Sequence, residues 1–220
     1  MHYSKITTAY NHLRSKSWLH TFIILTRYLI GFAFIPSGLK KIMGQRFTQI
    51  GIDNPIGFFF EGLYQSGFYW NFIGWVQVIA ALLLMTQRFA TIGAICFFFI
   101  VSNIWVITIS LQFSGTWVIT TLMLLAVIKL LLWDFHKWKY IFYPDNYELQ
   151  QLPKSYPANN STWGITGFIL FAWSMGGLIL LENLRPANTM LSRIWLAGIL
   201  LIVSTAVYLN KGKKKLIAIP

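Results

Sequence analysis

The chain has 220 residues, of which 56% are hydrophobic and 11% are charged, whereas a soluble domain carries about 25% charged residues. This composition excludes an ordinary soluble globular domain, because the apolar runs are too long and too numerous for the core of a chain of this size. The net charge of +12 would suit nucleic acid, but the distribution of the basic residues argues against that partner.

Six apolar runs follow one another along the chain. Most approach the roughly 20 residues that a helix needs to cross about 30 Å of hydrocarbon. Backbone polar groups inside lipid must be satisfied within their own segment, so each run predicts a helix. We therefore predict an all-α, polytopic membrane bundle of about six transmembrane helices, with spans at residues 21–39, 70–86, 89–111, 116–133, 163–181 and 194–209.

The basic residues predict how these spans are oriented. With the N-terminus in the cytoplasm, 11 Lys and Arg residues fall on the cytoplasmic side, five fall outside and two lie within spans. Cytoplasmic loops carry such an excess, so both termini are expected in the cytoplasm. Lipid bilayer is the expected partner and nucleic acid is not, and the residue usage favours a bacterial inner membrane.

The apolar pattern divides the chain into a core and a hairpin. Residues 1–20 are a predicted cytoplasmic segment, and residues 21–134 are a predicted four-span core. A cytoplasmic linker is expected at 135–162, a two-span hairpin at 163–210 and a basic cytoplasmic tail at 211–220.

The longest outer connection, residues 44–69, contains a helix-start signal. Asp53-Asn54-Pro55 places a capping residue directly before a proline suited to the first helical position. The aromatic residues that follow favour a short helix that lies in the outer interface or partly re-enters the membrane. An ordinary aromatic-belt loop is the alternative, and the residues do not decide between the two.

Polar side chains gather at a similar depth in the outer half of several spans. Gln77 lies seven residues into its span, and Asn103 lies at a similar distance from the outer end of the next one. These amides could line a ligand pocket, or they could act as interhelical hydrogen-bond glue worth about 0.6 kcal/mol each. The candidate ligand-binding residues are Lys40, Gln77, Asn103, Trp105, Thr120 and Glu182.

Charged residues also lie toward the inner side. Arg27 is inside the first span, and Asp134 follows the fourth span. We predict a structural ion pair between Arg27 and Asp134, with a Lys129–Asp134 pair as the alternative. Lys129 could instead extend to the headgroups. No metal site and no catalytic residue are predicted, because the histidines are scattered and Cys96 is the single cysteine.

Residues 27–46, which end the first predicted span, and residues 74–93, which cover the next turn, resemble the DoxX-like membrane proteins, a family that includes the DoxD/DoxX subunits of a thiosulfate:quinone oxidoreductase. Residues 27–46 (RYLIGFAFIPSGLKKIMGQR) contain an arginine and glycines before a G-x-x-K element, here Gly38-Leu39-Lys40-Lys41. Residues 74–93 (GWVQVIAALLLMTQRFATIG) resemble the second and third spans of the family. The resemblance covers about 21–134, and Gln77 stands where the family often has a glutamate.

The resemblance implies a small helical bundle linked to quinone or sulfur redox metabolism, without establishing an enzyme. Our first hypothesis is an accessory subunit of a membrane redox system, with no cofactor of its own and an outer pocket for a quinone or a lipid. The second is a structural subunit that docks a protein partner in a larger membrane complex. A third, weaker one is a transporter of a small molecule or lipid.

Overall fold

The computed structural model of the chain describes residues 10, 12–137, 161–183 and 189–217. Among these residues, six helices are long and apolar enough to cross a membrane, which confirms the predicted all-helical fold with about six spans. A shorter helix, α3, lies between the first two spans. The helices are α2 (Ser17–Ile42), α3 (Pro55–Gln65), α4 (Phe68–Met85), α5 (Ala90–Ser110), α6 (Thr116–Trp133), α8 (Ser161–Asn183) and α9 (Thr189–Ile217).

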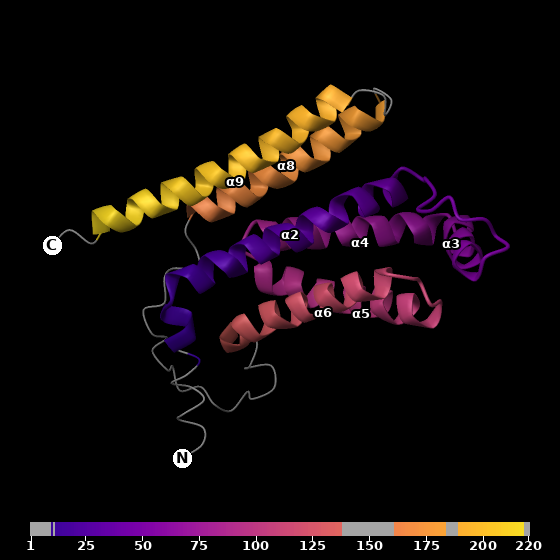
Figure 1. Cartoon of the computed structure of the whole chain (residues 1–220), viewed down its shortest axis with the longest axis horizontal. Coiled ribbons are helices and arrows are strands. Elements are labelled where there is room, and N and C mark those ends of the chain that lie inside the picture. The colour runs from indigo at the N-terminus through magenta and orange to yellow at the C-terminus, as the bar shows by residue number, and fades with distance from the viewer. Residues whose placement is uncertain (1–9, 11, 138–160, 184–188, 218–220) are drawn as a thin grey trace, which may run out of the picture.

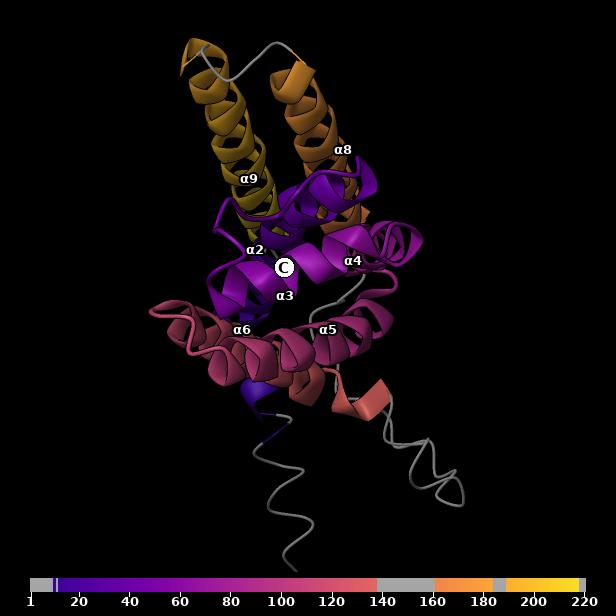
Figure 2. The same cartoon turned by 90° about the vertical axis from the view of Figure 1, so that its right-hand side faces the viewer.

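The spanning helices pack as three layers of paired helices (Figures 1 and 2). The central pair is α2 and α4, which contact one another most extensively. The α5–α6 pair covers one face of this layer, and the α8–α9 pair covers the other (Figure 2). We call the end of the bundle that carries α3 the outer end and the end that carries Asp134 the inner end, following the expected topology.

Small residues let α2 and α4 approach one another closely. A Cβ atom on Gly38 would lie 2.7 Å from Val78 Cγ2, and one on Gly74 would lie 2.7 Å from the carbonyl oxygen of Gly38. Without a strong hydrophobic force between helices in lipid, such backbone approach supplies the van der Waals packing that holds helices together. Close contact between α2 and α4 therefore depends on Gly38 and Gly74. The other spanning pairs pack against these two helices.

Helix α3 has the capped start that the sequence predicts. The side chain of Asn54 accepts a hydrogen bond from the backbone N–H of Ile56 at 2.9 Å, and Pro55 occupies the first turn. The helix lies across the outer end of the bundle (Figures 1 and 2). The segment thus forms a short helix instead of the alternative aromatic-belt loop, and it positions aromatic side chains above α4 and α5.

The α8–α9 pair joins the central layer through α8, which contacts both α2 and α4. The two helices hold one another by a reciprocal contact. Trp173 Nε1 donates to the carbonyl oxygen of Trp195 at 3.1 Å, and Trp195 Nε1 donates to that of Trp173 at 3.2 Å. Helix α9 continues to Ile217, into the predicted tail 211–220, because a helix satisfies its own backbone hydrogen bonds beyond the apolar run.

Parts of the predicted division lie outside the described residues. These are half of the N-terminal segment 1–20 and most of the linker 135–162.

Candidate functional site

A cavity of about 440 Å³ lies in the outer half of the bundle. Its walls come mainly from α4 and α5, α3 contributes to its outer part, and α2 contributes two polar side chains. Pockets for small molecules measure roughly 300–1,000 Å³ and are mostly apolar with a few polar groups. This cavity fits that description, since most of its lining is apolar, including Phe59, Phe60, Phe72, Ile73, Ile100 and Ile104.

A short row of polar groups enters the cavity from α2 and α4. Lys41 Nζ donates to the carbonyl oxygen of Ser37 at 3.1 Å and to Ser37 Oγ at 2.7 Å. Ser37 Oγ in turn donates to Gln77 Oε1 at 3.4 Å. Lys41 and Gln77 are both buried. The ammonium group also lies 4.8 Å from the ring centroid of Phe47 and 5.0 Å from that of Trp70, within the range of cation–π attraction.

Two further predicted residues lie at or behind the α5 wall. Asn103 lines the cavity, and its side chain makes no hydrogen bond to the part of the chain that the structure describes. Thr120 is buried in α6, and its Oγ1 lies 3.0 Å from Thr108 Oγ1. Thr108 itself lines the cavity. Gln77 and Asn103 therefore share one cavity, whereas Thr120 supports its wall from behind.

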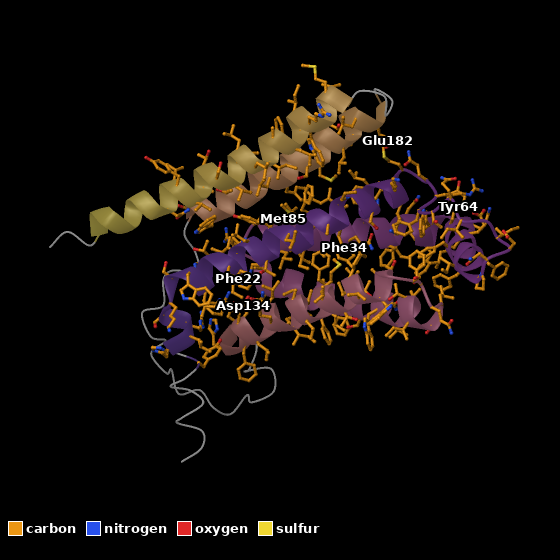
Figure 3. The ribbon with its side chains drawn as sticks, viewed as in Figure 1. Phe22, Phe34, Tyr64, Met85, Asp134 and Glu182 are labelled. Atoms are coloured by element: carbon orange, nitrogen blue, oxygen red, sulfur yellow. The ribbon has the colours of Figure 1, made fainter. Side chains whose placement is uncertain are left out.

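Three other predicted residues do not line this cavity. Lys40 is exposed, and Trp105 Nε1 donates to Thr121 Oγ1 at 2.9 Å, which ties α5 to α6. Glu182 lies at the outer end of α8 and accepts a hydrogen bond from Gln45 Nε2 at 3.1 Å (Figure 3).

Helix geometry explains these differences. Successive residues of an α-helix point roughly 100° apart, so Lys41 faces the cavity and Lys40 does not. Ser37 and Lys41 are four residues apart and therefore share one face of α2. Glu182 belongs to α8, which packs on the side of the central layer opposite α5 (Figure 2). Lys41 and α3 therefore line the cavity, and Lys40 and Glu182 do not.

Helix α3 is fastened over the cavity by an exposed ion pair. Arg46 Nε lies 2.8 Å from Glu61 Oε2, and Gln65 Nε2 donates to Glu61 Oε1 at 2.7 Å. The hydrogen bond from Arg46 holds the pKa of Glu61 at about 2. Glu61 is therefore charged at neutral pH, and the loop before α3 remains attached to the helix.

A buried ion pair includes Asp134, which lies at the end of the bundle opposite α3 (Figure 3). Arg27 Nη2 lies 2.7 Å from Asp134 Oδ2, and both side chains are 2% exposed. Arg27 Nη1 donates to Gln87 Oε1 at 2.8 Å, and Thr91 Oγ1 donates to Asp134 Oδ2 at 3.0 Å. Of the two pairings considered from the sequence, the structure forms Arg27–Asp134, while Lys129 Nζ donates to Thr26 Oγ1 at 3.1 Å.

This pair joins three helices at the inner end. Arg27 belongs to α2, Gln87 to the turn between α4 and α5, and Asp134 follows α6. Burial raises the pKa of Asp134. The charges of Arg27 and Lys137 and the hydrogen bond from Thr91 lower it by more than burial raises it, so the pKa lies below its usual value. The carboxylate is thus charged beside Arg27.

The segment before α2 reaches the same end of the bundle. Arg14 Nη1 donates to His136 Nδ1 at 2.5 Å, and the Tyr10 hydroxyl donates to the carbonyl oxygen of Trp133 at 2.7 Å. Burial, and then the charge of Arg14, lower the pKa of His136 to about 4. A neutral imidazole is required here, because a protonated Nδ1 cannot accept the arginine hydrogen bond.

This arrangement predicts a loss of stability in mild acid. The folded pKa of His136 lies below its ordinary value of 6.5, so the unfolded chain takes up a proton first. Stability is complete above about pH 6.5 and falls as the pH approaches 4. We expect the thermal midpoint measured between pH 7 and pH 4 to fall less steeply in His136→Asn than in the wild type. The same exchange at exposed His12 is the control, and equal slopes in all three proteins would contradict the assignment.

Sequence reasoning missed Lys41, Trp70 and Phe47. The helical period could have identified Lys41, because it lies four residues after the polar residue Ser37 and therefore shares one face of a helix with it. Trp70 and Phe47 carried no such signal. Trp70 is buried, and its Nε1 donates to the carbonyl oxygen of Gln45 at 3.0 Å, a contact between α4 and the loop after α2.

The comparisons with known proteins agree with part of this description. Residues 22–110 match the model of the DoxX family. The matched stretch runs from α2 to the end of α5, so it is shorter than the resemblance expected over 21–134. Comparison with curated proteins and with solved structures finds no match. The match thus contains most of the residues that line the cavity.

Proposed function

Because residues 22–110 form a DoxX family domain in an integral membrane protein with six candidate spans, we propose that the chain binds one amphipathic molecule in its outer cavity. The ligand is a quinone or a lipid, and the protein acts as an accessory subunit of a membrane redox system. The redox assignment is supported by the family resemblance. The ligand assignment is supported by the cavity itself.

The observation that carries the ligand proposal is the combination of an apolar wall with a few polar groups, of which Lys41 and Gln77 are buried and Asn103 is exposed. The cavity holds about 440 Å³ and presents the Lys41 ammonium and the amides of Gln77 and Asn103 among aromatic and aliphatic side chains. A molecule with a polar end and an apolar body would satisfy both parts. Polar residues that serve only to join helices would be hydrogen-bonded to one another, whereas the exposed side chain of Asn103 has no hydrogen-bond partner among the described residues.

Replacing both amides by leucine tests this proposal. In Gln77→Leu/Asn103→Leu we expect about tenfold less of the small molecule to co-purify, because each amide loses a hydrogen bond to the ligand that is worth roughly 1 kcal/mol. The measurement is quantitative mass spectrometry of everything that co-purifies with the full-length protein in a mild detergent, expressed per mole of protein. The fold should survive, since neither amide belongs to the inner ion-pair cluster.

Asn71→Leu provides a matched control, because Asn71 is also on α4 but does not line the cavity. It should retain the wild-type ligand content. A well-folded double variant with unchanged ligand content would reject the cavity as the binding site.

The same experiment addresses the docking alternative. Helix α9 leaves much of its apolar surface uncovered by the described chain, with Leu200 72% and Tyr208 77% exposed. A stoichiometric protein partner without any small molecule would make the chain a docking subunit, and the cavity amides would then serve the packing of the complex. Deleting residues 163–220 should abolish that association if α8 and α9 carry it.

A further inference from the structure

The Lys41 ammonium is a buried charge without a countercharge. The side chain of Lys41 is 6% exposed, and the ion pairs of the described residues join Arg27, Arg46 and Lys137 to carboxylates but not Lys41. The neighbouring cation, Arg46, is already paired with Glu61. A buried charge is costly unless it is paired, and in a membrane protein an unpaired one points to a binding function.

The hydrogen bonds of Lys41 are also incomplete. An ammonium group has three N–H donors. Two of them are used by the carbonyl oxygen and Oγ of Ser37. The faces of Phe47 and Trp70 surround the group without supplying an oxygen acceptor. One donor therefore remains for an acceptor that the described part of the chain does not provide.

The nearby amides add to this demand for an acceptor. Gln77 uses its oxygen to accept from Ser37, so its NH₂ group is left with no acceptor among the described residues. Asn103 faces the same cavity with both of its amide atoms unused by those residues. The polar end of the ligand should therefore be rich in acceptor oxygens, and it should carry negative charge to balance Lys41.

We propose that the cavity binds an acidic amphipath, whose carboxylate or phosphate accepts hydrogen bonds from Lys41 and Gln77 while its apolar chain lies between α4 and α5 beneath α3. This inference rests on the proposed function and chooses an acidic lipid among the ligands that the proposed function allows. A neutral quinone carbonyl would accept a hydrogen bond but would leave the ammonium charge uncompensated. A carboxylate or phosphate does both, and charge-assisted hydrogen bonds are roughly twice as strong as neutral ones.

Matched ligands test the charge requirement on the unaltered protein. Oleate and oleyl alcohol share one chain and differ in the carboxylate, and lysophosphatidic acid and monoolein make the corresponding comparison for a phosphate. Binding to the full-length protein is measured by native mass spectrometry in a neutral detergent. We expect oleate or lysophosphatidic acid to bind roughly tenfold or more tightly than its neutral counterpart. Whichever of oleate and lysophosphatidic acid binds more tightly shows whether the site prefers a fatty acid carboxylate or a phospholipid headgroup.

Variants then locate the effect. Lys41→Gln should weaken acid binding roughly 10- to 100-fold and leave binding of oleyl alcohol within about twofold. Lys41→Arg, which keeps the charge, should retain most of the acid preference. Lys40→Gln removes the same charge from the same helix but at an exposed position outside the cavity, so it should bind oleate as the wild type does.

The outcomes separate this inference from the proposed function. Equal binding of acids and neutral analogues by the wild type, or equal losses in Lys41→Gln and Lys40→Gln, would overturn the inference. If menaquinone binds under those conditions and is lost in Gln77→Leu/Asn103→Leu, the ligand-binding function stands without the acidic headgroup. If none of these molecules binds and none co-purifies, both fail. The wild-type comparison decides the inference even if Lys41→Gln does not fold.

Discussion

Asp134→Ala is expected to lower the free energy of unfolding by about 3–5 kcal/mol, the loss typical of a buried ion pair that is left with one partner. The change leaves the Arg27 guanidinium charged and buried, with Gln87 as its remaining hydrogen-bond partner among the described residues. It also removes the acceptor of Thr91. Thermal or chemical unfolding in detergent, followed by circular dichroism, would show the loss as a much lower midpoint.

An exposed ion pair provides the control for this prediction. Glu61→Ala removes the partner of Arg46, whose side chain is 50% exposed, and exposed ion pairs contribute little to stability because water screens them. The double variant Arg27→Met/Asp134→Leu should recover much of the stability, because it leaves no buried charge behind. A loss in Asp134→Ala no greater than that in Glu61→Ala would show that the inner pair does not hold the helices together.

Gly167→Ala is expected to weaken the attachment of the α8–α9 pair to the core. A Cβ atom at this position would overlap the carbonyl oxygen of Met85, which is backbone and cannot rotate away. Helix α8 would have to move off α4, which would strain the hydrogen bond from the Tyr28 hydroxyl to the carbonyl oxygen of Trp163. Overpacking of this kind costs about 1–3 kcal/mol, which a lower thermal midpoint would report.

Gly176→Ala is the matched control on the same helix. A Cβ atom there meets nothing within 4 Å, so the exchange should be neutral or should stabilise the helix by up to about 1 kcal/mol. If Gly167→Ala and Gly176→Ala behave alike, α8 does not depend on close contact with Met85. Increased proteolysis of the Gly167→Ala variant between α6 and α8 would support release of the hairpin.

The number and positions of the spans follow from the length of the apolar runs, because the bilayer fixes how much apolar helix is needed. The span predicted at 116–133 agrees with α6, Thr116–Trp133. The ends of other helices differ from the predicted span ends, because a helix can continue into polar residues beyond the apolar run. The first span was predicted at 21–39, whereas α2 covers Ser17–Ile42.

The membership of the cavity could be predicted only in part. Gln77 and Asn103 were identified because polar side chains at similar depth are unusual in apolar helices. Lys40, Trp105 and Glu182 share that outer depth, but depth alone does not say which face of a helix points to which neighbour. The rotation of α2 brings Lys41 to the cavity, and the placement of α8 on the opposite side of the central layer keeps Glu182 away from it.

The sequence by itself determined that this protein is an all-helical membrane bundle with six candidate spans, a capped outer helix and polar residues at one depth. Those features depend on local composition and on the thickness of the bilayer. Only the tertiary structure decided that Arg27 meets Asp134 across 107 positions of sequence and that Lys41 enters the cavity without a carboxylate partner among the described residues. The physical reason is that helix rotation and helix neighbours are set by side-chain packing between distant segments, which no local pattern contains.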